Sequence, residues 1–460
     1  MNGKRQETHC SVALETAGEG EALSGSGPRA EPFTANPASE SPAFVEQLME
    51  EVCNRENLEI AWKRVRRNKG SPGVDGMTID AAKDYLREQW PSIRSRLLDG
   101  TYQPLPVKRV EIPKPDGGVR KLGVPCVVDR LIQQALLQVL QKRWDPTFSE
   151  HSYGFRPGRS AHQAVAQAQR YIAEGYGIVA DLDLEKFFDR VNHDMLMARV
   201  ASRVSDKRVL RLIRAFLNAG VMEDGLVHPV DEGTPQGGPL SPLLSNLVLD
   251  DLDKELSRRG HRFCRYADDC NIYVRSRRAG ERVMASVTRF LTEKLKLKVN
   301  EAKSAVAQPE ERKFLGFTIT NDGAERRIAP KALNKFKVKI RDMTSRTRGR
   351  SLEQIVEDLA PYLIGWRGYF GFCQTPRVLT HLEAWIRRRL RSYLWRQWRN
   401  GPNRFKELRR RGVSKFHAAV AASSPTGCWR MSSHPAVQQA LRNHVFDDLG
   451  LPRLYVTAKA

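Results

Sequence analysis

The sequence predicts an α+β fold, in which short strands in the middle of the chain are framed by helices. Apolar residues recur at helical spacing in FVEQLMEEVCNRENLEIAWKRVRRN, from Phe44 onward. Two later segments alternate like strands, GIVADLDLEKFF (177–188) and FCRYADDCNIYV (263–274). From about residue 331 to about residue 400 the chain is helical in pattern, basic and aromatic.

Turn and cap residues mark further elements between these segments. In RVEIPKPDGGVRKLGVP the Asp116-Gly117-Gly118 sequence predicts the turn of a β-hairpin. The segment DRLIQQALLQVLQKRW predicts a helix with Asp129 at its N-cap. After the Gly- and Pro-rich loop GTPQGGPL, a helix is expected with Ser241 at its N-cap and Pro242 in its first position.

The charge distribution points to a polyanionic partner. The chain of 460 residues has a formal net charge of +23. Residues 1–45 carry 3 basic and 6 acidic residues, so the rest carries +26, and residues 331–400 hold 16 Lys or Arg against 5 Asp or Glu. Like charges gather at a cost unless a countercharge is expected, so nucleic acid is the first expectation and an anionic membrane surface the second.

The remaining composition narrows the class of protein. Residues 1–42 are rich in Gly, Ser, Ala, Glu and Pro, and we expect a disordered leader there. None of the 7 cysteines forms a C-x-x-C pair, so neither a zinc site nor a disulfide framework is expected. No apolar run is long enough to cross a bilayer, and no secretory signal is visible. These features predict a cytoplasmic protein with reduced thiols and no membrane partner.

Two adjacent aspartates, Asp268 and Asp269, interrupt the second strand-like segment. Aspartate is a poor strand residue, and two neighbouring carboxylates repel each other unless a cation or proton intervenes. At a hairpin tip they could chelate a hard cation through oxygen. Asp183 on the first strand is the obvious third ligand and Asp181, on the same face, is its rival. Three such carboxylates would suit two Mg²⁺ ions, although an ordinary acidic turn is the simpler interpretation of the pair alone.

The order of the motifs resembles a bacterial group II intron-encoded reverse transcriptase. Eight segments carry this resemblance, and they cover roughly residues 46 to 400: IPKPDGGVRKLGVP, HSYGFRPGRSAHQAV, VADLDLEKFFDRVNHD, GTPQGGPLSPLLSNLVLDDLD, RYADDCNIYV, LKVNEAKSAV, KFLGF and GWRGYFGF. The H-N-H endonuclease spacing of longer members is not seen, so the chain is similar to the class C enzymes and no endonuclease activity is expected.

The resemblance implies a right-hand polymerase with a fingers, palm and helical thumb layout. The fingers would span 43–175 and the palm 176–328, with an interleaved fingers segment. A maturase or thumb domain would follow at 329–400, and a short basic extension that binds DNA or RNA at 401–460.

The resemblance also implies roles for the residues of the catalytic centre. Asp183 is preferred over Asp181 because an aromatic residue, Phe188, follows it five positions later. Phe188 would be the steric gate that favours dNTPs. Asp183, Asp268 and Asp269, with the carbonyl of Leu184, would bind two Mg²⁺ ions, and Mn²⁺ would be able to substitute for them. The other roles implied are those of Lys303, as general acid for the pyrophosphate, and of Lys114, Arg120 and Gln236 in the nucleotide pocket.

Nucleic acid contacts complete the expected site. By resemblance, the RNA template with its DNA or RNA primer would lie against Arg156, Tyr266, Phe314, Leu315 and Gly316, with 314–317 forming a strand that grips the primer. The basic helical segment would present guanidinium groups to RNA phosphates, from Arg387, Arg388, Arg391, Arg396 and Arg399.

The function implied is that of an RNA-directed DNA polymerase and maturase. Such a protein binds its group II intron RNA, promotes splicing, and copies the RNA into DNA at a target DNA site during retrohoming. Two alternatives stay open, namely a splicing cofactor with a vestigial polymerase and a host-adapted reverse transcriptase in defence or mutagenesis. A homodimer is also left open.

Overall fold

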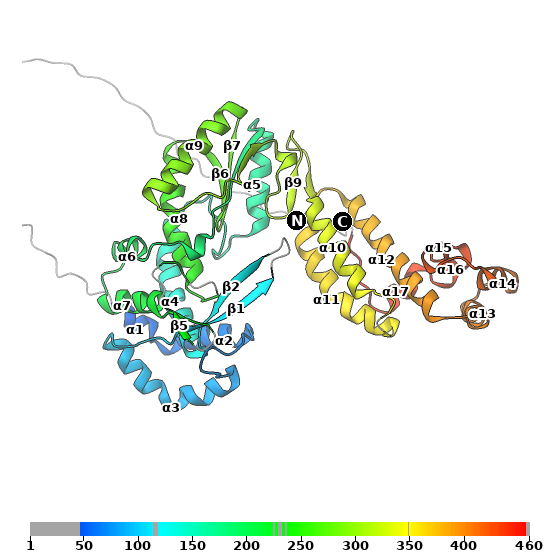
Figure 1. Ribbon diagram of the computed structural model, residues 1–460, viewed down its shortest axis with the longest axis horizontal. Coiled ribbons are helices and arrows are strands. Elements are labelled where there is room, and N and C mark those ends of the chain that lie inside the picture. Colours follow the sequence, from blue (N-terminus) through cyan, green and yellow to red (C-terminus); the bar gives the residue numbers. More distant parts are fainter. Residues whose placement is uncertain are drawn as a thin grey trace, which may run out of the picture. The chain divides into compact units, whose positions relative to one another are not determined.

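The computed structural model describes residues 47–113, 118–223, 226–228, 232–234, 237–347 and 349–456 (Figure 1). All of them lie in one compact unit, Glu46–Ala460. The leader expected at residues 1–42 lies outside the described residues.

The first third of the unit is helical around one hairpin. Its elements are α1 (Leu48–Val52), α2 (Arg55–Arg67), α3 (Ile79–Leu98), β1 (Val107–Pro113), β2 (Val119–Val124), α4 (Val127–Trp144), the 3-10 turn η1 (Asp145–Thr147) and α5 (Ala161–Ala173). Asn54 and Thr78 cap α2 and α3 through their side-chain oxygens. The hairpin expected in the first strand pair is confirmed, since β1 and β2 pair antiparallel from Lys108–Val124 to Pro113–Val119.

The N-cap prediction for α4 is wrong. The helix begins at Val127, after Cys126, and Asp129 lies in its first turn. The buried Asp129 carboxylate accepts hydrogen bonds from the Tyr102 hydroxyl (2.8 Å) and the Leu105 amide (3.2 Å). It therefore ties α4 to the segment before β1 instead of capping its own helix. The N-cap prediction for α8 is also wrong, because Leu240 occupies the N-cap position and Ser241 is the first residue of the helix.

The central part holds the sheet that positions the aspartates. The elements are β3 (Ile178–Leu182), η2 (Phe187–Asp189), α6 (His193–Ala201), α7 (Lys207–Asn218), β4 (Val221–Glu223), β5 (Leu226–His228), α8 (Ser241–Arg258), β6 (Arg262–Tyr266), β7 (Asp269–Val274), α9 (Arg277–Lys294), β8 (Ala305–Ala307), η3 (Pro309–Glu311), β9 (Phe317–Ile319) and β10 (Arg326–Ile328). The sheet order β6-β7-β3-β8 is antiparallel throughout. A second sheet has the order β2-β1-β4-β5, and β9 pairs with β10.

The two faces of the central sheet belong to different cores. Ala180 and Leu182 of β3 are buried in a large cluster with α4 and α8, whereas Val179 joins a smaller cluster with α5. This alternation is what the sequence pattern of β3 predicts, and it leaves Asp181 on the face opposite Ala180 and Leu182. The α+β prediction is thus confirmed.

The last third of the described unit is helical. It comprises α10 (Pro330–Met343), α11 (Leu352–Phe370), α12 (Pro376–Gln397), α13 (Gly401–Arg410), α14 (Lys415–Ser423), α15 (Cys428–Met431), α16 (Pro435–Ala440) and α17 (Asn443–Asp448). One hydrophobic cluster runs through all of it, from Ile328 to Leu454. Within the described residues, no helix combines the length and the apolar character that a bilayer crossing requires.

Candidate active site

The two adjacent aspartates lie at the tip of a β-hairpin, as the sequence predicts. Strands β6 and β7 pair antiparallel up to Tyr266 opposite Asp269, so Ala267 and Asp268 form the turn. Ala267 has a left-handed backbone conformation, with φ 58°. A non-glycine residue takes this conformation only where its surroundings hold it there, which happens often at functional sites.

Asp183 reaches the same end of the sheet from the neighbouring strand. Leu182, the last residue of β3, pairs with Cys270 of β7, and Asp183 follows directly. Although solvent reaches Asp269, the packed atoms around it and the Asp268, Asp181 and Asp183 carboxylates raise its pKa to about 7. We call Asp183, Asp268 and Asp269 the carboxylate triad. Its charges repel one another and call for a cation.

Contacts distinguish Asp183 from its rival Asp181. The Arg312 guanidinium donates to the Asp181 carboxylate at 2.6 and 2.9 Å, so that carboxylate is already paired. The Asp183 carboxylate instead faces the Lys303 ammonium at 3.6 Å, and the Lys303 side chain is 65% exposed. These contacts favour Asp183 as a ligand, and they place Lys303 in the site without fixing its role.

The backbone near Asp183 supports a ligand role for the Leu184 carbonyl. The Asn300 amide donates to the Asp183 carbonyl and the Glu185 amide donates to the Lys298 carbonyl, both at 2.8 Å, on either side of the Leu184–Val299 bridge. A residue between two such bonds turns its own carbonyl to the other side of the strand. For Leu184 this is the side on which β7 runs.

The triad has the oxygen ligands that suit Mg²⁺, although its carboxylates do not surround a common position. Among the described residues, no three His, Cys, Asp or Glu side chains are already close enough to hold a metal ion together. The donor set is nonetheless all oxygen, which Mg²⁺ prefers, and an ion would relieve the repulsion that raises the Asp269 pKa.

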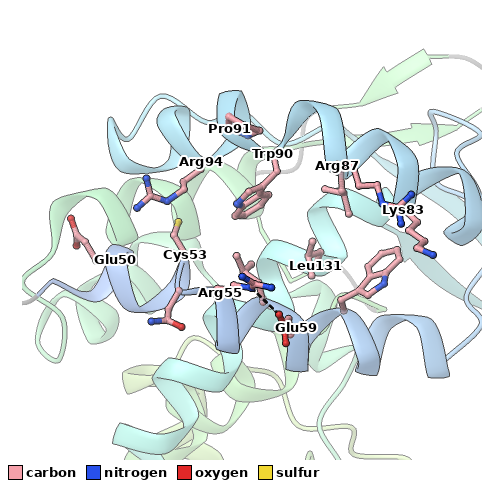
Figure 2. Close-up of a pocket in the computed structure, with 14 residues that line it drawn as sticks. Glu50, Cys53, Arg55, Glu59, Lys83, Arg87, Trp90, Pro91, Arg94 and Leu131 are labelled. Atoms are coloured by element: carbon pink, nitrogen blue, oxygen red, sulfur yellow. Dashed lines mark hydrogen bonds and ion pairs between the residues drawn. The ribbon is translucent and has the colours of Figure 1, made fainter.

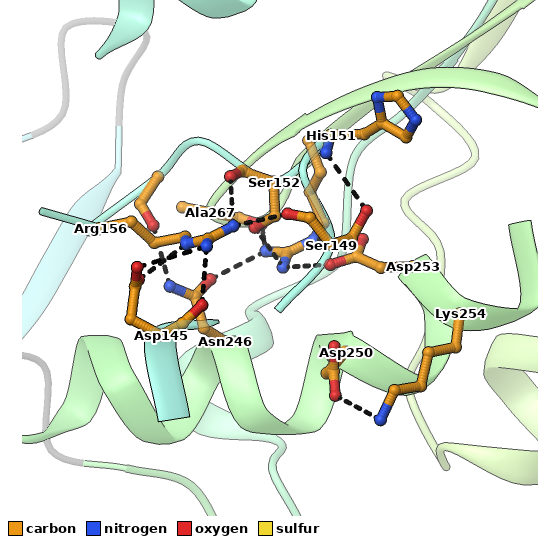
Figure 3. A network of polar contacts seen from close by, with 12 residues as sticks. Asp145, Ser149, His151, Ser152, Arg156, Asn246, Asp250, Asp253, Lys254 and Ala267 are labelled. Carbon is orange, nitrogen blue, oxygen red and sulfur yellow. Dashed lines mark hydrogen bonds and ion pairs between the residues drawn. The ribbon is translucent and has the colours of Figure 1, made fainter. Parts of the chain in front are cut away.

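A buried network holds the turn from behind (Figure 3). The Arg265 guanidinium is fully buried and pairs with Asp253 of α8 at 2.6 and 2.7 Å. It also donates to the Ala267 carbonyl at 2.9 Å and to the Ser152 hydroxyl at 2.7 Å. We call these contacts the Arg265 network. Because Ala267 precedes Asp268, the network fixes the strained residue that aims the two aspartates.

The loop before α5 approaches the same turn closely. The Asn246 side chain donates to the Gly154 carbonyl at 2.8 Å. A Cβ on Gly154 would lie 2.3 Å from the Ala267 amide nitrogen, so the close approach requires glycine at this position.

Phe188 borders a cavity of about 450 Å³ between η2, β1, β2 and the loop at 232–234. Phe187 beside it is 2% exposed and belongs to the core, whereas Phe188 is only partly buried against that core. Four basic residues also line the cavity, and sequence reasoning missed them: Arg109, Lys121, Lys186 and Arg190. The β1–β2 hairpin was visible in the sequence, but its position beside Phe188 was not. Arg109 and Lys121 of that hairpin could therefore not be assigned to the cavity from the sequence.

The structure does not describe the side chains of three residues that are expected in the nucleotide pocket. Lys114 and Gln236 lie outside the described residues. The backbone of Arg120 pairs with Ile112 across the β1–β2 hairpin, and its side chain lies outside the description. Their roles stay predictions.

A second cavity, of about 790 Å³, is lined by residues of α1 to α4 (Figure 2). Trp62, Trp90 and Leu131 give it apolar walls, and Arg55, Lys83, Arg87 and Arg94 surround them. It contains none of the residues that the sequence singles out, and it lies on the helices that precede and follow β1 and β2.

Comparison with known proteins connects this geometry to a family. Residues 112–319 match the reverse transcriptase (RNA-dependent DNA polymerase) family, and residues 333–412 match the group II intron, maturase-specific domain. Protein YkfC of Escherichia coli (strain K12) is 32% identical over 316 residues, which are 58% of this chain and 81% of YkfC. The group II intron-encoded protein LtrA of Lactococcus lactis subsp. cremoris is 37% identical over 196 residues, which are 42% of this chain and 32% of LtrA.

The chain belongs to the group II intron reverse transcriptases. It is an RNA-directed DNA polymerase of the right-hand fold, joined to a maturase domain. The carboxylate triad lies within the reverse transcriptase match. The basic helix α12 lies within the maturase match, which begins inside the basic helix α10.

The segment expected to grip the primer is a tight turn, so the prediction of a strand over 314–317 is wrong. Phe314 and Phe317 bond to each other across Leu315 and Gly316, whose φ angles are 51° and 83°. Strand β9 begins only at Phe317. The Tyr369 hydroxyl of α11 donates to the Leu315 carbonyl at 2.8 Å. The maturase domain thereby holds the turn in place.

Arg156 is a structural residue here, which contradicts its expected contact with the primer or template. Its side chain is 5% exposed and pairs with Asp145 at 2.8 Å. It also donates to the carbonyls of Ser149 and Ser152. A guanidinium used in this way has no donors left for phosphate. Tyr266, by contrast, is half-buried beside the turn and stays a candidate contact.

The arginines of α12 in the maturase domain, and Arg399 just after it, divide into two groups. Arg387 is buried and pairs with Glu383 and Asp447, while Arg391 donates to the Leu441 carbonyl and the Asn443 side chain. Arg388 lies over the Trp429 ring at 4.2 Å and bonds to Ser432. These three hold α12 to residues 429–447, so their expected RNA role is not supported. Arg396 and Arg399 are exposed, as an RNA contact requires.

Proposed function

We propose that this reverse transcriptase copies its own group II intron RNA into DNA by Mg²⁺-dependent nucleotidyl transfer, and that it binds the same RNA to promote splicing. The observation that carries the polymerase part is the carboxylate triad at the adjoining ends of β3 and β7. The maturase match over residues 333–412 supports the splicing part. Copying at a target DNA site would make the intron mobile.

Each group of residues has a task in this proposal. Asp183, Asp268, Asp269 and the Leu184 carbonyl would hold two Mg²⁺ ions. Bound Mg²⁺ would promote deprotonation of the primer 3′-hydroxyl and stabilise the charge on the departing pyrophosphate. Phe188 would bound the sugar side of the dNTP, beside the cavity of about 450 Å³ that it lines. Arg109 and Lys121 in that cavity, with Lys114 and Arg120 of the hairpin, would bind the triphosphate.

Lys303 would supply a proton to the pyrophosphate as it leaves. Its ammonium lies 3.6 Å from the Asp183 carboxylate and remains largely open to solvent. That position keeps the ammonium at the triad while leaving donor hydrogens for a phosphate oxygen. We further propose a cytoplasmic location, where intron transcripts are made in bacteria.

The decisive experiment is primer extension on an RNA template. Asp268→Ala should abolish dNTP incorporation, because it removes a ligand oxygen pair from the triad. Asp84→Asn is the matched control, since Asp84 is an exposed residue of α3 and its variant should extend primers like the wild type. Full extension by Asp268→Ala would refute the polymerase assignment.

Splicing should be measured on the same variants. If the protein is both polymerase and maturase, Asp268→Ala retains RNA binding and splicing while losing incorporation. A wild-type protein that splices but incorporates no dNTP would identify a splicing cofactor with a vestigial polymerase.

A further inference from the structure

Two hollows flank the first residue of strand β6, which is an edge strand of the central sheet. One, of about 500 Å³, is bordered by β7 and α9. The other, of about 520 Å³, is bordered by α5. Arg262 lines both of them, and its neighbours β7, α5 and α9 are labelled together in Figure 1. The two hollows therefore form one continuous surface.

This surface is lined by arginines with few acidic neighbours. We call the exposed residues Arg159, Arg170, Arg262, Arg275 and Arg282 the arginine edge. The hollow against α9 contains no Asp or Glu among its described lining residues, and the other contains Glu150 and Glu174. A further arginine of the first hollow, Arg259, is already paired with Glu255 at 2.6 Å. Among the described carboxylates, none forms an ion pair with the arginine edge.

Aromatic rings hold two members of the arginine edge in place. The Arg275 guanidinium lies 5.1 Å from the Tyr176 ring centroid, and the Arg159 guanidinium lies 5.6 Å from that of Tyr153. A guanidinium held over a ring face loses rotamer freedom but keeps in-plane N–H donors for a ligand. This differs from Arg387 of α12, whose donors are taken up by two carboxylates.

The arginine edge lies far from the catalytic turn along the same hairpin. Arg262 pairs with Tyr273 at the end of the hairpin opposite Asp268. Four strand steps of about 3.3 Å place Arg262 about 13 Å along β6 from Tyr266, after which Ala267 and Asp268 form the turn. A ligand of the arginine edge is thus distinct from the dNTP that reaches the carboxylate triad.

We propose that the arginine edge binds the phosphodiester backbone of a folded RNA. Five guanidinium groups, on α5, β6, α9 and the loops beside them, line two hollows and exceed what a single phosphate can engage. Guanidinium forks match phosphate oxygens in pairs, and a basic surface with stacked aromatics is typical of nucleic acid contacts. The inference rests on the proposed function for the kind of RNA, a group II intron, but the surface itself rests on charge and geometry alone.

The test compares two triple variants of equal charge. Arg262→Gln/Arg275→Gln/Arg282→Gln removes three members of the arginine edge. Arg277→Gln/Arg278→Gln/Arg289→Gln removes three exposed arginines of α9 that line neither hollow. Each protein is first loaded with an RNA template and a dideoxy-terminated DNA primer, which fills the polymerase channel. Binding of a fluorescein-labelled RNA hairpin is then followed by anisotropy over a salt series.

The arginine-edge variant should bind the RNA hairpin about tenfold or more weakly, and its log K versus log salt slope should fall by about two to three, whereas the control should stay within about threefold of wild type. Extension of an unblocked short template–primer should be unchanged in both. Equal losses in the two variants, an unchanged salt slope, or the same loss on a DNA hairpin of identical sequence would overturn the proposal. A wild-type protein that binds the hairpin but extends no primer would refute the polymerase function and leave this surface standing.

Discussion

Arg265 lies one residue before Tyr266, and its guanidinium contacts both Asp253 and the Ala267 carbonyl. It neither lines the cavity beside Phe188 nor contacts the carboxylates of the triad. Its effect on catalysis would therefore pass through the turn, because a carbonyl held at 2.9 Å fixes the orientation of the peptide that precedes Asp268. Arg265 is a positioning residue in this sense.

Replacing Arg265 by Lys should show whether the turn needs the guanidinium geometry or only a positive charge beside Asp253. Lysine keeps the ion pair with Asp253 but lacks the planar fork that reaches Ala267 and Ser152 at the same time. We expect kcat for primer extension to fall by about tenfold or more, since small misplacements of catalytic groups are costly. The measurement is steady-state primer extension together with thermal unfolding of the same samples.

The control for Arg265→Lys is Arg265→Met. Methionine leaves Asp253 as a buried, unpaired charge and should cost about 3–5 kcal/mol of unfolding free energy. If Arg265→Lys lost activity only in proportion to a loss of folded protein, the positioning role would be wrong.

Helix α12 shows how one element can serve two purposes. Arg387, Arg388 and Arg391 face residues 429–447, whereas Arg396, near the end of the helix, and Arg399, two residues past it, face solvent. A helix places residues three and four apart on one face, so the buried arginines and Arg396 fit on one amphipathic element.

Substitutions of the buried and of the exposed arginines should therefore affect different properties, the melting temperature in one case and RNA binding in the other. Arg391→Gln should lower the melting temperature, because the Leu441 carbonyl and Asn443 side chain lose their donor, and should leave the salt dependence of RNA binding unchanged. Arg396→Gln/Arg399→Gln should weaken RNA binding and lower the salt slope by about two with an unchanged melting temperature. Both are read by anisotropy and calorimetry. A weaker salt slope in Arg391→Gln would show that it contacts RNA after all.

Asp129 of α4 gives the fold a pH dependence. Burial raises the pKa of its carboxyl to about 6 from an ordinary value of 3.8, against the lowering effect of the Tyr102 hydrogen bond. The folded state then binds more protons than the unfolded state between these two values. The contribution of Asp129 to the unfolding free energy consequently falls as pH rises from about 4 to about 6 and is constant above that range.

Asp129→Asn should remove this dependence. Asparagine stays neutral, so urea unfolding of the variant should change less between pH 5 and pH 7 than that of the wild type, by about 1–2 kcal/mol. A matched wild-type series at both pH values is the control, because other groups titrate in both proteins. Identical pH slopes in the two proteins would show that Asp129 is not the group responsible.

The unit as a whole contains a maturase core that extends well past residue 400. Leu408, Phe446 and Leu454 share one hydrophobic cluster with α10 to α12, and the maturase match itself runs to residue 412. The last 60 residues therefore contribute to the hydrophobic core besides carrying basic charge. The domain boundary expected at residue 400 stays a prediction.

Two phenylalanines of this region test the shared core. Phe446 is fully buried and Phe416 is 72% exposed. Phe446→Ala should lower the unfolding free energy of the maturase core by about 3–5 kcal/mol, whereas Phe416→Ala should change it by less than about 0.5 kcal/mol. Thermal unfolding monitored by tryptophan fluorescence is the measurement. Similar melting temperatures for both variants would mean that residues 401–456 fold apart from α10 to α12.

Short-range sequence patterns predict those parts of this protein that depend on neighbouring residues. The YADD hairpin, the β1–β2 hairpin and the alternation of β3 follow from turn chemistry and a two-residue period, both of which act over a few positions. The family resemblance, through the five-residue spacing from Asp183 to Phe188, favours Asp183 over Asp181, and the ion pair between Arg312 and Asp181 agrees with it.

The role of each arginine, by contrast, depends on contacts that form between distant parts of the folded chain. Arg156, Arg265 and Arg387 look like phosphate ligands in a chain of net charge +23, but each is buried against a carboxylate from another element: Asp145, Asp253 and Asp447. The arginines of the β6 edge look no different in sequence, and they are exposed on hollows without carboxylate partners among the described residues. Whether a guanidinium is paired or available for a ligand depends on the groups that folding places beside it. Those groups come from distant parts of the chain, so local residue spacing does not predict them.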